Sequence, residues 1–141
     1  MTTRINNTNI GTLSEFSVSG LLELQQSSEL IQTKSSATGT VEHDYTAGAI
    51  VWHTSPSANF TVNVTNLPNT SERANVLTLF VVQGATPYMP TALQIDGTAK
   101  TINWLSGTTP SGNADKTNLI TFYLINISST YYVFGQTSYY G

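Results

Sequence analysis

The sequence predicts an all-β fold, an antiparallel β-sandwich of jelly-roll-like type, on three observations. Short runs of alternating apolar and polar residues recur along the chain, and residues 60–65 are the clearest of them. Turns containing Gly, Pro and Asn separate these runs at regular spacing, as in sandwiches and barrels with about eight to ten strands. Strand and helix patterns do not alternate, so a parallel α/β fold is not expected.

Three segments give the clearest strand predictions. Residues 60–65 place apolar side chains on one side and polar ones on the other, as in a half-buried antiparallel strand. Residues 74–83 are almost continuously apolar, which predicts a central strand buried on both faces. Asp96–Gly97 supplies the positive φ angles of a tight hairpin turn within residues 92–104. The other predicted strands cover residues 15–24, 37–45, 49–53, 119–125 and 131–134, the last two as a second hairpin.

The segments between these strands are less regular. Residues 25–34 fit either a short helix or a turn followed by a strand. Residues 105–116 form a predicted loop, and loops of that length are uncommon unless they contact something. Residues 135–141 follow the last predicted hairpin and contain the pair Tyr139–Tyr140.

The chain divides into an arm and one domain. Residues 1–13 are polar and lack periodicity, which predicts an N-terminal arm whose order depends on a partner. Residues 14–141 are expected to form a single sandwich, since no linker or repeat interrupts them. A domain of about this size buries roughly two-thirds of its unfolded surface, so it needs neither disulfides nor metal to fold. The sequence contains no cysteine.

Charged residues are scarce. They make up 9% of the chain, against about a quarter in an ordinary soluble domain. Ser, Thr and Asn supply about a third of the residues instead. The net charge is −3 and the five cations are scattered, so there is no basic patch for nucleic acid. No stretch is long and apolar enough for a membrane span. We therefore expect a surface that packs against other proteins, with no nucleic-acid and no membrane partner.

Few residues could support catalysis or metal binding. His43, Asp44 and His53 are of types that bind zinc. However, His43 and Asp44 are adjacent and point to opposite faces of a strand, and no spacing pattern supplies a third ligand. Histidines hydrogen-bonded to neighbouring hydroxyls are the favoured interpretation. Neither a nucleophile elbow nor a phosphate-binding loop occurs, so we expect no enzyme activity, catalytic residue, metal or cofactor.

Aromatic residues near amides suggest a binding function. Tyr88, Trp104, Thr108 and Asn113 could form a ligand loop, because aromatic faces stack on sugar rings and amides bind sugar hydroxyls. Tyr and Trp in strands more often pack in the core or across strands, and we favour that interpretation. The terminal pair Tyr139–Tyr140 is predicted to contact a neighbouring subunit or sheet edge.

Several motifs occur along the chain in a consistent order. They are the stretches 37–45 (ATGTVEHDY), 53–61 (HTSPSANFT), 66–70 (NLPNT), 83–90 (QGATPYMP), 94–104 (QIDGTAKTINW), 110–116 (PSGNADK) and 132–135 (YVFG). With these motifs, the chain over residues 18–141 resembles a domain common in virion structural proteins of marine tailed phages, particularly those that infect cyanobacteria. The resemblance implies no catalytic residue and no cofactor.

From the residues and the resemblance together we expect a non-enzymatic capsid decoration (cement) protein. It would lie on the virion surface after assembly in the host cytoplasm, contact the major capsid protein, and act as a homo-oligomer, with a trimer favoured. The predicted contact residues are Arg4, Ile5 and Ile10 in the arm, with Tyr139 and Tyr140. The alternative is a tail-fibre or receptor-binding module that recognises host surface glycan through the ligand loop.

Overall fold

The computed structural model describes residues 19, 21, 23 and 25–141. In these residues the chain forms ten strands and two short 3-10 helices. The elements are β1 (Ile31–Ser35), β2 (Gly39–Asp44), η1 (Tyr45–Ala47), β3 (Ile50–Thr54), β4 (Phe60–Thr65), β5 (Arg73–Val82), β6 (Pro90–Ile95), β7 (Thr98–Lys100), β8 (Ile102–Trp104), η2 (Leu105–Gly107), β9 (Thr117–Ile127) and β10 (Thr130–Tyr140).

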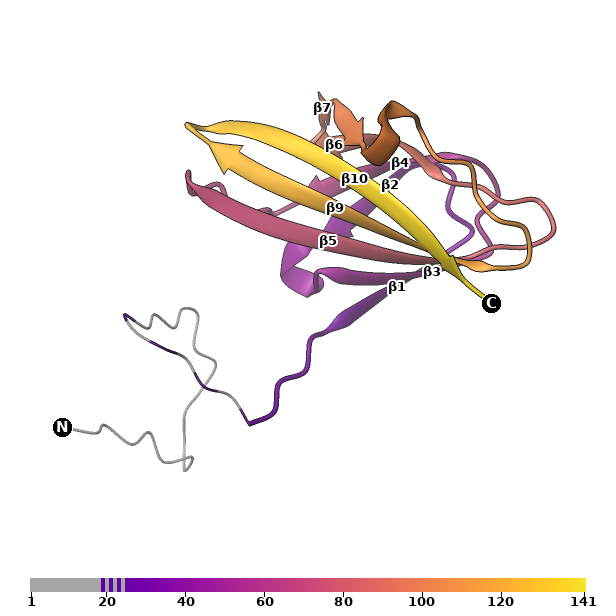
Figure 1. The fold of residues 1–141 in the computed structure, drawn as a ribbon, viewed down its shortest axis with the longest axis horizontal. Helices are drawn as coiled ribbons and strands as arrows, with labels where there is room; N and C mark the ends of the chain where they lie inside the picture. The colour runs from indigo at the N-terminus through magenta and orange to yellow at the C-terminus, as the bar shows by residue number, and fades with distance from the viewer. Residues whose placement is uncertain (1–18, 20, 22, 24) are drawn as a thin grey trace.

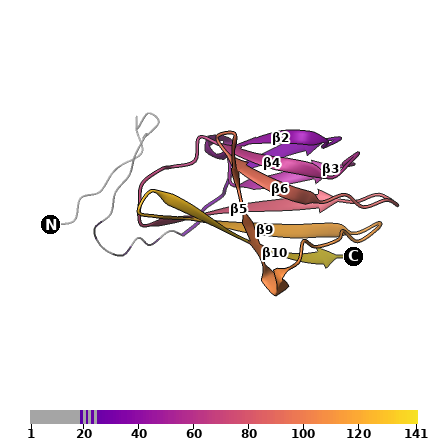
Figure 2. The same cartoon turned by 90° about the horizontal axis from the view of Figure 1, so that it is seen from above.

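Two sheets pack face to face, which confirms the predicted all-β sandwich. The larger sheet has the strand order β1-β3-β5-β9-β10-β8, and the smaller one has the order β2-β4-β6-β7. In Figure 1 strands β5, β9 and β10 lie side by side in front of β2, β4 and β6. In Figure 2 the labelled strands of both sheets lie roughly along one common axis.

The sheets are mixed, whereas the sequence predicts antiparallel pairing throughout. Strands β1 to β6 alternate between the two sheets along the chain, and β1, β3 and β5 pair in parallel, as do β2, β4 and β6. Parallel neighbours need a crossover connection. Here each crossover is a strand of the opposite sheet, so the jelly-roll-like antiparallel order does not occur in this half of the chain.

Antiparallel pairing is confined to β5–β9 and two hairpins. Asp96 and Gly97 both have positive φ angles and connect β6 to β7, as predicted. The second arm of that hairpin then divides, because β8 leaves the small sheet and pairs with β10 of the large one. Ser128 and Ser129, also with positive φ, connect β9 to β10.

The core is one layer of side chains between the sheets. In β4 the burial alternates along the whole strand, with the apolar side chains buried and the polar ones half-buried, as predicted. Strand β5 differs from its prediction. Leu77, Leu79 and Val81 are buried, but Phe80 and Val82 on the other side are only half-buried. The large sheet therefore has a core side and an open side.

The structure also bears on the predictions for three irregular segments, residues 25–34, 135–141 and 15–24. Residues 25–30 form neither a helix nor a hydrogen-bonded turn, and β1 follows them, so the strand of the turn-and-strand alternative is confirmed and its turn is not. Residues 135–140 belong to β10 rather than lying beyond the hairpin. The predicted strand 15–24 lies mostly outside the described residues, and Ser19, Leu21 and Glu23 are not in a strand. No helix in the described part of the chain is long and apolar enough to span a membrane.

Gly135 allows β8 to attach to the large sheet. It pairs with Trp104 in the register of β8 and β10. A Cβ atom at residue 135 would lie 2.6 Å from Trp104 Cε3 and 2.9 Å from Ile102 Cγ2. The Trp104 ring itself packs against Phe122 of the core, with 5.6 Å between ring centroids. A side chain at residue 135 would therefore displace Trp104 from the core.

We predict that Gly135→Ala lowers the free energy of unfolding by about 1–3 kcal/mol, the range for overpacked positions. Urea unfolding followed by tryptophan fluorescence measures it. Gly84→Ala is the matched control, because a Cβ there meets nothing within 4 Å, and its effect should stay within about 0.5 kcal/mol. Equal stability of the two variants would contradict the packing described for Trp104.

Candidate interaction surface

The open side of the large sheet is the main candidate site, and we call it the outer face. It faces the viewer in Figure 1 and consists of the residues that alternate with the core residues along the six strands. Between its large apolar side chains lie Thr, Ser, Ala, Asn and Gln residues. The large apolar members are Ile31, Ile50, Trp52, Val76, Phe80, Val82, Leu119, Tyr123, Ile125, Ile127, Tyr132, Phe134 and Tyr140.

Aromatic side chains stand on this face in cross-strand contact. Trp52 and Phe80 are register partners on β3 and β5, and their rings stack with centroids 5.6 Å apart. Tyr123 on β9 is paired with Phe134 on β10. Five aromatic rings of the face remain between 40% and 58% exposed, namely those of Trp52, Tyr123, Tyr132, Phe134 and Tyr140. Cross-strand packing therefore covers these rings only in part.

The two outer sides of the sandwich differ in charge. None of the outer-face residues on the six described strands is charged. The corresponding side of the small sheet has the polar residues Thr61, Asn63 and Thr65 on β4, with the carboxylates of Glu42 and Asp44 beside them on β2. Monomeric proteins rarely expose large contiguous apolar patches, and such patches mark interaction sites. The outer face fits that description, whereas the small sheet has an ordinary solvated surface.

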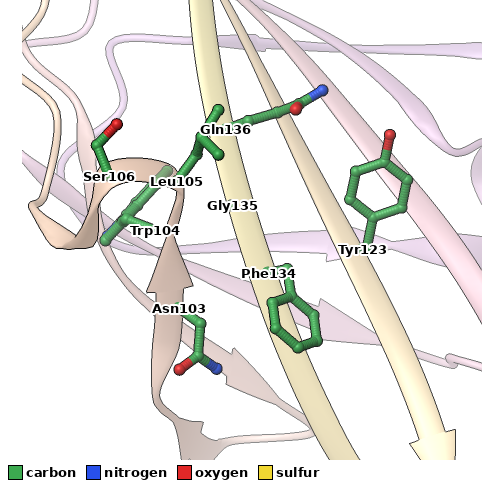
Figure 3. A pocket seen from close by; sticks show the side chains of 8 residues that line it. All are labelled: Asn103, Trp104, Leu105, Ser106, Tyr123, Phe134, Gly135 and Gln136. Atoms are coloured by element: carbon green, nitrogen blue, oxygen red, sulfur yellow. The ribbon is translucent and has the colours of Figure 1, made fainter.

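A groove of about 370 Å³ lies at the β8–β10 corner of the outer face. Figure 3 shows Leu105 and Trp104 on one side of it, with Phe134, Gln136 and Tyr123 on the β9–β10 side. The Trp104 ring is partly buried, so the rings of Phe134 and Tyr123 are the more exposed aromatic walls. Asn103 and Gln136 add amides, and the Asn103 amide donates to the Val133 carbonyl. The lining is apolar and amide-rich, without charge.

The predicted ligand loop is only partly assembled. Of its four residues, Trp104 lines this groove, whereas Tyr88, Thr108 and Asn113 do not. The backbone of Tyr88 exchanges two hydrogen bonds with the buried Gln83 side chain, each 2.9 Å long.

The remaining predicted contact residues have different outcomes. Asn113 is held by the buried Asn118, whose Nδ2 donates to Asn113 Oδ1 at 2.9 Å and whose Oδ1 accepts from the Asn113 backbone. Tyr139 and Tyr140 are exposed, and Tyr140 belongs to the outer face. The predicted arm contacts Arg4, Ile5 and Ile10 lie outside the described residues.

The sequence favours core or cross-strand packing for strand aromatics, and Trp52 does stack across strands on Phe80. That interpretation did not predict that Trp52, Tyr123, Tyr132 and Phe134 are also exposed. Strand aromatics usually pack in cores, and the sequence contains no direct sign that a sheet lacks cover on one side. A signal did exist. In residues 117–127 both alternating sets of positions are mainly apolar, although β9 packs on the core with one set only.

The sequence predicts histidines that are hydrogen-bonded to neighbouring hydroxyls, and this is wrong. The two histidines instead form a buried pair with each other. His43 on β2 and His53 on β3 are fully buried, and their Nε2 atoms lie 2.8 Å apart. His43 Nδ1 lies 2.9 Å from the Val41 carbonyl oxygen, which can only accept, so Nδ1 carries the proton. His43 Nε2 then accepts a hydrogen bond from His53 Nε2–H. His53 Nδ1 is left as a buried lone pair without a partner.

This hydrogen bond joins the two sheets through the core, and burial holds both rings neutral. Burial is the main reason that the pKa of His43 falls from 6.5 to about 3, and the nearby His53 is the second. Burial likewise lowers the pKa of His53 to about 4, with the cation of Lys34 as a second cause. Asp44 points away from the pair and caps η1 through a 3.0 Å bond from the Thr46 amide. No cluster of three or more metal-ligating side chains occurs among the described residues.

The pair makes stability depend on pH. Both pKa values are lower in the folded protein than the 6.5 of an unfolded histidine. The unfolded chain therefore binds more protons between pH 6.5 and about 4, and stability falls as pH falls through that window. We predict a loss of up to about 1.4 kcal/mol per pH unit for each histidine. Chemical unfolding at several pH values tests this.

The double variant His43→Leu/His53→Leu is the control for the pH dependence. It should unfold with a flatter pH dependence between pH 6.5 and 4, whatever its absolute stability. The same slope in the variant and in the unaltered protein would show that other groups cause the effect.

Comparison of the chain with protein-family models, with curated proteins and with solved structures finds no match. The arguments for function therefore come from the residues and their geometry.

Proposed function

We propose that this protein is a non-enzymatic virion structural protein, a capsid decoration protein that stabilises the particle shell by packing against other protein subunits. The observation that supports this most is the uncharged, aromatic outer face of the large sheet. A surface of this kind loses little by being covered, since no charge has to be desolvated. It also gains from contact, because apolar area is removed from water.

The proposed mechanism is stabilisation by added contact. A homo-oligomer, with a trimer favoured, presents several copies of each contact surface to the shell. Linked contacts act together, so individually modest interfaces give high occupancy without any single strong site. The proposed partner is the major capsid protein, and the place of action is the particle surface. Residues 1–13 and the exposed pair Tyr139–Tyr140 are the proposed contacts with the shell.

The groove at the β8–β10 corner favours one alternative, a fibre-tip or receptor-binding module for a neutral host glycan. Phe134 and Tyr123 provide aromatic faces, and the amides of Asn103 and Gln136 lie beside them. Such a lining suits an uncharged sugar. However, few polar side chains line the groove, and the Asn103 amide already donates to the Val133 carbonyl. We therefore rank this function second.

We predict that the protein co-sediments with virus particles stripped of it, and that deletion of residues 1–13 abolishes this binding while the far-UV circular dichroism of the sandwich is retained. The double substitution Tyr139→Ala/Tyr140→Ala should weaken particle binding by about tenfold, as expected for exposed aromatic contacts. Full occupancy by the truncated protein would exclude the arm as the contact. Failure of the intact protein to bind particles would exclude the decoration function.

A glycan array with the isolated protein separates the two functions. We expect no saccharide to bind, since the groove is largely apolar. Clear binding that Phe134→Ala removes and Thr61→Ala leaves intact would replace the decoration function by glycan recognition.

A further inference from the structure

We propose that the occupant of the outer face is a second copy of this chain, so that two large sheets pack against each other and the homo-oligomer is a two-fold dimer in place of the trimer favoured above. This deepens the proposed function, on which it rests, by naming the partner of one surface. The shell contacts are then left to other parts of the molecule.

The exposed apolar area of the face is of the size that a stable interface needs. Tyr140 is left to the shell, and the other four partly exposed aromatic residues of the face retain 40–48% of their area. Together they expose on the order of 350 Å², taking about 200 Å² for a whole aromatic side chain. A standard interface covers about 800 Å² on each partner, and slightly more than half of that is non-polar. The four aromatic residues therefore supply about three-quarters of that non-polar area, and the exposed Ile31, Val76 and Ile127 add to it.

The outer face is chemically complementary to a second copy of itself. Its polar positions carry hydroxyls and amides, which donate and accept hydrogen bonds, and none of its described positions carries a charge. A strongly acidic or basic partner would leave its own charges unpaired against this surface, at a desolvation cost. A second copy brings the same neutral, aromatic surface. The groove beside Phe134 and the exposed Leu105 at its rim add a recess and a projection on one face.

Association through the sheet edges is less favourable. On the edge strand β1, Lys34 lies on the side of the sheet that faces the core, and inward charges of this kind discourage edge pairing. The side chain of Gln32 on the same strand donates to the carbonyls of Asp44 and Gly48. The opposite edge, β8, has three residues only. In the large sheet, the face rather than either edge is therefore favoured for self-association.

Sedimentation velocity of the full chain at micromolar concentrations tests the proposal. We expect the unaltered protein to be oligomeric and Phe134→Lys to weaken association by about tenfold or more, because each copy would bury an unpaired charge. Thr61→Lys places the same charge on the outer side of the small sheet and should associate like the unaltered protein. Circular dichroism and the unfolding midpoint check that each variant is folded. Tyr132→Lys, on a ring 48% exposed, serves if Phe134→Lys does not fold.

Each outcome decides between the proposals. An unaltered protein that stays monomeric across the micromolar range overturns the inference, as does a folded Phe134→Lys variant that associates as before. A monomer that still co-sediments with particles overturns the inference and leaves the decoration function standing. An oligomer that fails to bind particles supports self-association through the outer face and overturns the decoration function.

Discussion

A single layer of side chains holds this protein together, and much of the rest follows from it. Val62 on the small sheet and Leu79 and Phe122 on the large one belong to the same fully buried core. Each strand has only two sides, so a residue that does not enter this layer points away from it. The large sheet has more strands than the small one, and at least as many large apolar residues on its outer side as on its core side. An open apolar side is therefore part of how the sandwich is built.

The histidine pair is the polar element within that layer. One ring comes from each sheet, and their hydrogen bond fixes how β2 and β3 face each other across the core. Both rings are inaccessible to a substrate, and their low pKa values keep them neutral near pH 7. The arrangement stabilises one packing of the sheets and is poorly suited to proton transfer with anything in solution.

Local patterns predicted the strands well and their environment poorly. The alternation in residues 60–65 gave both the strand and its buried side, because burial on a half-covered sheet depends on local periodicity. Whether two neighbouring strands pair in parallel depends on how the chain connects them. The residues of a single strand contain no signal that the following strand lies in the other sheet. The apolar run at Phe80 and Val82 predicted a second buried face, but no described element covers that side.

The candidate site was harder to predict than the fold. Trp104 was found as a groove residue, but Tyr88 and Asn113 are held in the end loops by the buried amides of Gln83 and Asn118. Buried amides of this kind look like ordinary polar residues in a sequence rich in Asn and Thr. In the sequence, the exposed Phe134 looks like a core residue because it is aromatic and lies in a strand. Only the register of β9 and β10 shows that it lies on the outer side of the sheet.

Hydroxyl-radical footprinting of the oligomer and of the dissociated monomer tests most directly whether protein neighbours cover the outer face. We expect Trp52, Tyr123 and Phe134 to lose most of their reactivity in the oligomer, while Tyr88 in the end loop keeps its own. Unchanged reactivity of the three outer-face rings in the oligomer would contradict the account.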